Sequence, residues 1–158
     1  MEKRNQNIEV CARAVIMNQG RILICWHKLN NHYFFPGGHV EYGELAEKAL
    51  SRELKEELDI KIKKALFIGL TENIYSDYDI SGGPARYEQK GEPHHEINLV
   101  FQVFTDKVKD KSMEDYIDFS FFSQKEFRTK RVLPPSLQKS VLKWLKDKKT
   151  FRICEVRS

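Results

Sequence analysis

The sequence predicts an α/β (α+β) protein in which helices pack on both faces of a mixed β-sheet. Short apolar segments rich in Val, Ile, Phe and Tyr recur along the chain, and turn residues separate them, as is typical of strands. Two longer segments consist of strong helix formers. The length of 158 residues, with 41% hydrophobic and 32% charged residues, fits one globular domain, so we expect residues 1–158 to share one core.

Three strands are expected near the N-terminus. Residues 9–17 and 21–27 are apolar, and Asn18-Gln19-Gly20 between them is typical of a turn, which predicts a β-hairpin. Tyr33-Phe34-Phe35 forms a third strand. We expect Pro36-Gly37-Gly38 to end it, because proline lacks an N–H group and glycine permits positive φ.

A helix is expected from about Glu44 to Leu58, a segment without Gly or Pro. At about 100° per residue its apolar side chains fall on one face, which is formed by Ala46, Ala49, Leu50 and Leu54. Glu53 and Glu57 point along the same stripe, and Glu56 lies close to them, since residues three and four apart are neighbours on a helix. We therefore expect three carboxylates to converge at the C-terminal end of this helix.

Such a cluster of acids requires positive charge nearby. Like charges repel, burial penalises each of them, and the C-terminal end of a helix disfavours negative charge. Arg52 flanks the group but supplies one charge only. Carboxylate oxygens suit a hard cation such as Mg²⁺ or Mn²⁺, which predicts a metal site. The alternative is a surface helix whose extra acids form salt bridges.

The middle of the chain predicts strands separated by a long loop. Residues 60–62 alternate, and residues 65–70 form a short apolar run that we interpret as a strand. Residues 71–93 are polar and rich in turn signals, and a loop of this length is commonly functional or mobile. Residues 96–104 and 115–122 are expected to be strands.

The C-terminal part predicts a capped helical turn, a longer helix and a last strand. Ser123-Gln124-Lys125-Glu126 resembles a capping box. Pro134-Pro135-Ser136 opens the longer helix, whose core side comprises Leu137, Val141, Leu142 and Leu145, with Trp144 at its border. Residues 151–156 are apolar enough to add a strand.

The stretch from Gly38 to Ile60 resembles the signature of the Nudix hydrolase family. Gly38 is followed by five residues, Glu44, seven residues and then Arg52-Glu53-Leu54-x-Glu56-Glu57-x-x-Ile60. One position departs from the family pattern, because Asp59 stands where the family has glycine. That glycine ends the helix in the left-handed conformation, which Asp adopts at a cost of about 1–2 kcal/mol. The departure leaves the acidic residues intact.

The resemblance implies a fold, a reaction and a set of site residues. The fold is the Nudix α/β/α sandwich. The reaction is Mg²⁺-dependent hydrolysis of a diphosphate linkage in a nucleoside diphosphate derivative, with Mn²⁺ as a substitute. Candidate substrates are nucleotide sugars, dinucleoside polyphosphates, ADP-ribose-like compounds and nucleoside triphosphates. The implied metal ligands are Glu53, Glu56, Glu57 and the carbonyl of Gly38. Arg52 would orient the acids through ion pairs, and Glu44 would support the junction between the loop and the helix. Gly37, Gly38 and Glu44 are the implied residues on the substrate side of the site.

Several further side chains are weaker candidates. The general base is Glu57 or Glu96, and the sequence leaves both open. Tyr75 and Tyr78 could stack on a base, while His94 and His95 could contact phosphate or transfer a proton. Arg13 and Trp26 could line a base pocket. For each of these residues, a packing or surface role is the competing interpretation.

Composition and charge restrict the other functional classes. A net charge of +4 fits an anionic small-molecule ligand, and nucleic acid is not expected, since basic residues do not alternate with aromatic ones as in RNA-reading modules. The N-terminus has no secretory signal and no apolar run approaches the ~18 residues that span a membrane, so we expect a cytoplasmic protein. The sequence leaves a monomer and a homodimer open. The alternative to an enzyme is a Nudix-like module that senses a nucleotide without cleaving it.

Overall fold

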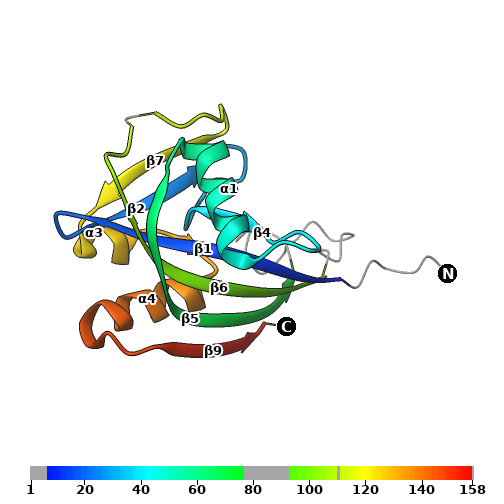
Figure 1. Cartoon of the computed structure of the whole chain (residues 1–158). Helices are drawn as coiled ribbons and strands as arrows, with labels where there is room; N and C mark the ends of the chain where they lie inside the picture. The colour runs from blue at the N-terminus through cyan, green and yellow to red at the C-terminus, as the bar shows by residue number, and fades with distance from the viewer. Residues whose placement is uncertain (1–6, 77–92, 110, 158) are drawn as a thin grey trace.

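The structure is a computed structural model that describes residues 7–76, 93–109 and 111–157. These residues form a mixed sheet with helices on both sides, which confirms the predicted fold class (Figure 1). In chain order the elements are β1 (Ile8–Asn18), β2 (Arg21–His27), β3 (His32–Phe34), β4 (Gly37–His39), α1 (Ala46–Leu58), β5 (Ile62–Ser76), β6 (Pro93–Thr105), β7 (Ile117–Phe122), α3 (Gln124–Thr129), β8 (Val132–Leu133), α4 (Pro135–Asp147) and β9 (Phe151–Val156).

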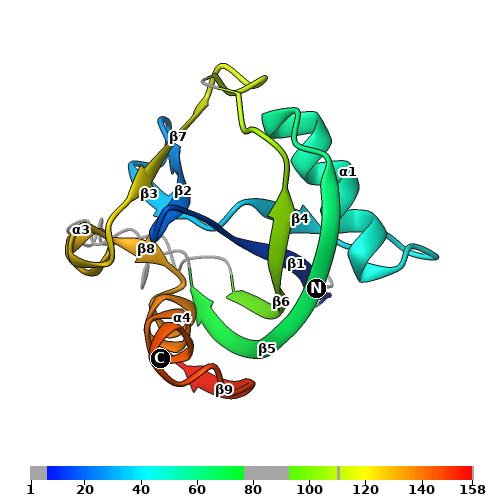
Figure 2. The same ribbon diagram turned by 60° about the vertical axis from the view of Figure 1, so that its left-hand side comes forward.

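Strand β1 connects the two halves of the sheet. It runs parallel to β6, which continues through antiparallel β5 to parallel β9. At its C-terminal end β1 turns back through Gln19 and Gly20, both with positive φ, into β2, so the predicted hairpin is confirmed. β2 then pairs with β3 and β7. Figure 2 shows the two groups of strands diverging from β1.

Two apolar clusters hold the helices on the sheet. One includes Leu50, Leu54 and Leu58 of α1. The other includes Phe127 of α3 together with Leu137, Val141 and Trp144 of α4. The core face of α4 differs in detail from the prediction: Trp144 is buried, whereas Leu142 and Leu145 are only partly covered.

The segment after β3 was expected to stop the strand, yet Gly37 and Gly38 form strand β4 against β1. Gly37 pairs with Arg13 and Gly38 with Ala12. The close approach requires glycine, since a Cβ atom at position 37, where φ is +131°, would lie 2.0 Å from the carbonyl oxygen of Ala12. The glycines therefore attach the loop before α1 directly to the central strand.

The predicted loop over residues 71–93 is wrong for its first part, because β5 continues to Ser76. Thr71 and Asn73 are buried there, and their polar side chains bond to each other and to residues from distant segments. Polar residues can stay in a buried strand when such partners exist. The remainder, residues 77–92, lies outside the described residues.

The predicted ends of the helices are confirmed at two places. Asp59 ends α1 in the left-handed conformation, with φ 51° and ψ 36°. Its carboxylate pairs with Lys109 and Lys55, which lower its pKa to about 2. Ser123 and Glu126 form the capping box of α3.

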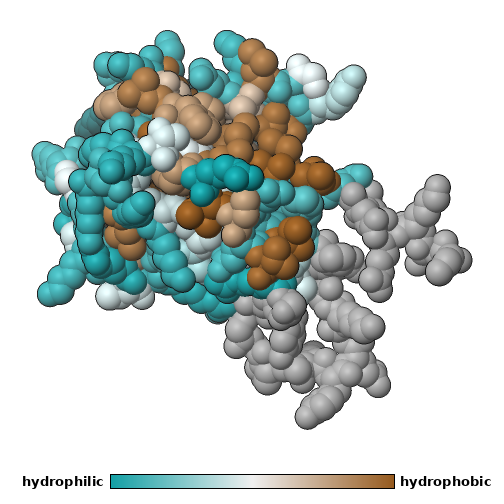
Figure 3. Space-filling view, turned by 90° about the horizontal axis from the view of Figure 1, so that it is seen from below, coloured by the Kyte–Doolittle hydropathy of each residue, from teal (hydrophilic) through white to brown (hydrophobic). Residues whose placement is uncertain are grey.

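The outer strand β9 confirms the last predicted strand and exposes Ile153 and Val156. Figure 3 views the molecule from the side of β9 and shows a largely hydrophilic face with separate hydrophobic patches. Among the described residues, no helix has both the length and the apolar composition required to cross a bilayer. A homodimer stays a prediction.

Candidate active site

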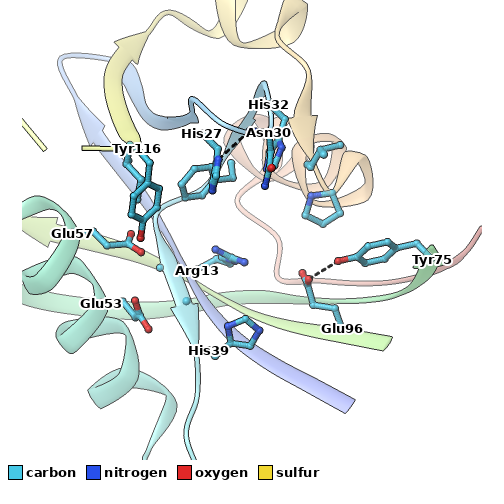
Figure 4. A pocket seen from close by; sticks show the side chains of 16 residues that line it. Arg13, His27, Asn30, His32, His39, Glu53, Glu57, Tyr75, Glu96 and Tyr116 are labelled. Carbon is cyan, nitrogen blue, oxygen red and sulfur yellow. Dashed lines mark hydrogen bonds between the residues drawn. The ribbon is translucent and has the colours of Figure 1, made fainter. Parts of the chain in front are cut away.

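A cleft of about 370 Å³ opens where β1, β4, β6 and the C-terminal half of α1 meet (Figure 4). It combines acids, one arginine, histidines and aromatic rings. The lining residues are Arg13, His27, Asn30, His32, Phe34, Gly37, Gly38, His39, Glu53, Glu57, Tyr75, Glu96, Tyr116, Ile117, Leu133 and Pro134. The cleft therefore contains most of the predicted site residues, although these come from four separate elements, β4, α1, β5 and β6.

Two of the three predicted acids, Glu53 and Glu57, line the cleft from α1. Glu53 lies directly against β4, because a Cβ atom at Gly38 would be 2.4 Å from its Cδ atom. Glu57 Oε2 is buried and has no hydrogen-bond partner among the described residues. Burial, and secondly the charge of Glu53, raises the pKa of Glu57 to about 7.

Arg52 forms ion pairs with Glu44 and Glu53. Its Nε and Nη2 atoms each donate to one oxygen of Glu44 at 3.0 Å, and Nη1 donates to Glu53 Oε1 at 2.9 Å. Nη2 also donates to the carbonyl oxygen of His39 at 3.1 Å. Because Glu44 is engaged in this way and does not line the cleft, it supports the loop before α1 from outside the cleft, and its role toward the substrate stays a prediction.

Glu56 differs from the other two acids. Its side chain is 56% exposed, lies 3.6 Å from Arg52 Nη1 and does not line the cleft. Over the part of the chain that the structure describes, no three His, Cys, Asp or Glu side chains are grouped closely enough to hold a metal together. The expected convergence is thus seen for Glu53 and Glu57, and the role of Glu56 stays a prediction.

Arg13 lies in the middle of the cleft, between the acids of α1 and Glu96 (Figure 4). Its Nε atom donates to Asn98 Oδ1 at 3.2 Å and its Nη1 atom to the carbonyl oxygen of Phe35 at 3.3 Å. These two hydrogen bonds fix the position of the guanidinium within the cleft. Arg13 was only a weak candidate in the sequence, because the pairing of β1 with β6 that places it could not be predicted.

Glu96 forms the wall opposite to α1 and is only 7% exposed. Tyr75 donates its hydroxyl proton to Glu96 Oε2 at 3.0 Å, and Asn98 Nδ2 donates to Oε1 at 2.5 Å. Burial, and next the charge of Glu96, raises the pKa of Tyr75, so this phenol remains a hydrogen-bond donor. His94 stacks on Tyr75 with ring centroids 5.0 Å apart.

A third wall carries rings that the sequence did not single out. His27 lies 5.7 Å from His32 and 5.4 Å from Tyr116 between ring centroids, and His32 lies 6.1 Å from Phe34. Burial lowers the pKa of His32. These flat side chains, with Asn30 beside them, suit a planar group such as a base. The signal in the sequence was weak, because the rings come from three segments that only the sheet brings together.

Other candidates lie elsewhere. His95 bonds to Glu72 at 2.8 Å and does not line the cleft. Trp26 does not line the cleft and packs near Tyr33, with ring centroids 4.6 Å apart. Tyr78 lies outside the described residues.

Glu53 and Glu57, the acidic side chains that line the cleft from α1, fit a divalent cation. Glu53 and Glu57 offer carboxylate oxygens and Gly38 offers a carbonyl oxygen, and Mg²⁺ and Mn²⁺ prefer oxygen ligands. Glu57 Oε2 is buried without a partner in the described part of the chain, which is costly unless a ligand satisfies this oxygen. Gly38 and Glu53, which lie against each other, line the same cleft as Glu57.

Residues 7–145 match the family model described as NUDIX domain. The fold is similar to that of the MutT protein from Methanosarcina mazei Go1, with 20% identity, TM-score 0.67, and coverage of 92% of this chain and 98% of that chain. A NUDIX hydrolase from Nitrosomonas europaea matches with 20% identity, TM-score 0.65, and coverage of 90% and 92%. An ADP-ribose pyrophosphatase from Streptococcus suis 89-1591 matches with 12% identity, TM-score 0.59, and coverage of 94% and 100%.

Proposed function

Since the chain belongs to the Nudix hydrolase family, we propose that it is a pyrophosphohydrolase that cleaves the diphosphate linkage of a nucleoside diphosphate derivative. The single observation that supports this best is the arrangement of the cleft. Glu53 and Glu57 face a cationic side chain, Arg13, across a space that is large enough for a nucleotide.

A divalent cation would be held by Glu53, Glu57 and the carbonyl of Gly38, with Glu56 joining them once its carboxylate leaves Arg52. Mg²⁺ or Mn²⁺ would supply positive charge that offsets the charge of the diphosphate and makes its phosphorus easier to attack. Arg52 keeps the Glu53 carboxylate in place through its bond of 2.9 Å. It thereby positions a ligand without contacting the substrate.

Glu57 is the better of the two candidates for the general base. One of its two carboxylate oxygens would bind the cation and the other would accept the proton of the attacking water, and Oε2 has no hydrogen-bond partner among the described residues. Glu96 lies on the far side of Arg13, and both of its oxygens already accept hydrogen bonds. Arg13 would donate to the non-bridging phosphate oxygens, because its guanidinium is permanently charged and is held in place by its hydrogen bonds to Asn98 and to the carbonyl oxygen of Phe35.

The test is a panel of nucleotide sugars, dinucleoside polyphosphates, ADP-ribose, NADH and nucleoside triphosphates, assayed for release of a mononucleotide with Mg²⁺, Mn²⁺ or EDTA. We expect turnover of at least one class that depends on the cation. The Glu57→Gln variant should lose it, while Glu47→Gln, on the exposed face of the same helix, should keep it. If a member of the panel binds and none is hydrolysed with either cation, the chain is a nucleotide-sensing module instead.

A further inference from the structure

The two sides of Arg13 differ in the groups that they offer to a ligand. On one side lie the acids of α1, which fit a cation and the phosphates that it holds. On the other side lies Glu96, whose carboxylate faces the same cleft (Figure 4). A substrate whose diphosphate lies between α1 and Arg13, and whose base lies against the rings around His27, would therefore extend its far end toward the Glu96 carboxylate.

The Glu96 carboxylate is fixed in place by donors of known orientation. The Asn98 amide cannot flip by 180° without losing hydrogen bonds. Its oxygen accepts from Arg13, and its nitrogen donates to Glu96 Oε1 and to Thr71 Oγ1. Tyr75 holds the other oxygen. These bonds continue through Thr71 and Asn73 to Ser136 on α4, and all of these polar side chains except Tyr75 and Arg13 are buried.

Glu96 retains capacity to accept further hydrogen bonds. An ionised carboxylate offers about four lone-pair positions, and one hydrogen bond to each oxygen leaves about two of them. The groups that can use them are hydrogen-bond donors, such as sugar hydroxyls. A phosphate group has no proton to donate when it is fully ionised, and it would meet a like charge at this wall.

We propose that Glu96 determines which diphosphates are accepted, by favouring a hydroxyl-bearing group such as a sugar beyond the second phosphate and by disfavouring a third phosphate. The proposal rests on the proposed function, because it presumes that the diphosphate lies between α1 and Arg13. It assigns the chain to diphosphates that join a nucleoside to a polyhydroxylated group, in preference to nucleoside triphosphates.

The test compares ADP-ribose with ATP, which share ADP and differ only in the group that follows it. UDP-glucose and UTP form a second such pair. In the wild-type protein we expect kcat/KM with Mg²⁺ to favour the sugar compound by at least about tenfold. In Glu96→Gln, which keeps the size of the side chain and removes its charge, that ratio should fall by about tenfold or more. An unchanged ratio, or an equal loss for both members of a pair, would overturn the proposal.

Two further variants separate selectivity from folding. Tyr75→Phe removes one donor to Glu96 without changing charge, and we expect a smaller fall in the same ratio, by about threefold. Glu72→Gln removes a carboxylate of the neighbouring strand that pairs with His95 outside the cleft, and the ratio should remain that of the wild type. If Tyr75→Phe leaves the ratio unchanged, or Glu72→Gln changes it as Glu96→Gln does, the proposal is wrong.

The proposal can fail separately from the proposed function. If the wild-type protein hydrolyses none of these compounds, the proposed function is wrong, and the dissociation constants of both pairs can be measured with Mg²⁺ by calorimetry. A preference for the sugar compound that is lost in Glu96→Gln would still support the selectivity. Equal affinity for both members of each pair would refute it.

Discussion

The carboxylate of Glu53 lies directly against the backbone of Gly38, so closely that a Cβ atom at position 38 would lie 2.4 Å from its Cδ atom and 2.6 Å from Oε1. From the other side, Arg52 donates to the same Oε1 at 2.9 Å. Glu53 is therefore fixed between a strand and a guanidinium. Its position depends on the absence of a side chain at residue 38.

We expect Gly38→Ala to displace Glu53 and to lower kcat/KM by about 10² or more, since small misplacements at a reacting site are costly. Stability should fall by about 1–3 kcal/mol, because the methyl group meets a carboxylate that Arg52 holds in place. Urea unfolding and steady-state kinetics measure the two effects. Gly43→Ala is the control: φ is +80° and a Cβ atom there would meet no atom of the described residues within 4 Å, so the change should cost about 1–2 kcal/mol and leave kcat/KM unchanged. Normal activity of Gly38→Ala would contradict the assignment of Glu53.

The capping box of α3 should make stability depend on pH. The backbone N–H of Ser123 donates to Glu126 Oε2 at 2.7 Å, and this bond holds the pKa of Glu126 below its ordinary value of 4.5. Because the folded pKa is the lower one, the contribution of the charge is present above about pH 4.5 and is lost as the pH falls through the folded pKa. The free energy of unfolding, measured in urea, should therefore exceed that of Glu126→Gln at pH 7, and the difference should shrink toward pH 3. A difference that grows on acidification would contradict this.

Local signals in the sequence predicted much of the fold. The turn at Gln19-Gly20, the end of α1 at Asp59 and the capping box at Ser123 each depend on a few neighbouring residues, and all three are confirmed. The extension of β5 through Thr71 and Asn73 was missed for the opposite reason. Those polar residues are compatible with a buried strand only because side chains from β6 and α4 bond to them, and a local pattern cannot show such partners.

The site residues also fall into those that a local pattern predicts and those that depend on distant segments. Helical periodicity was sufficient to place Glu53 and Glu57 on one side of α1. It could not place Glu56, whose carboxylate lies near Arg52, on the exposed side of the helix. The ring wall around His27 and the position of Arg13 depend on which strands are adjacent in the sheet, and that information is not contained in any single segment.

Arg52→Lys should weaken the site although it conserves charge. A lysine cannot reproduce the two parallel bonds to Glu44 and the bond to Glu53 at once. We expect about a 10- to 100-fold loss in apparent Mg²⁺ affinity or in kcat/KM, as is typical when a residue that orients a metal ligand is changed. Mg²⁺ titrations of activity measure this. Arg128→Lys, exposed on α3, should behave like the wild type. An unchanged Mg²⁺ dependence in Arg52→Lys would show that Glu53 does not need this support.

Removal of the cation by EDTA should abolish turnover, and addition of Mg²⁺ or Mn²⁺ should restore it. The same cations should raise the Tm of the wild-type protein, because a ligand that binds only the folded state stabilises it. In Glu57→Gln both effects should be lost, with kcat reduced by about 10²–10⁴. In EDTA this variant should be no less stable than the wild type, since it loses a buried charge whose Oε2 atom has no partner among the described residues. Calorimetric scans with and without Mg²⁺ test this, with Glu47→Gln as the matched control. If Mg²⁺ raises the Tm of Glu57→Gln as much as that of the wild type, Glu57 is not a ligand.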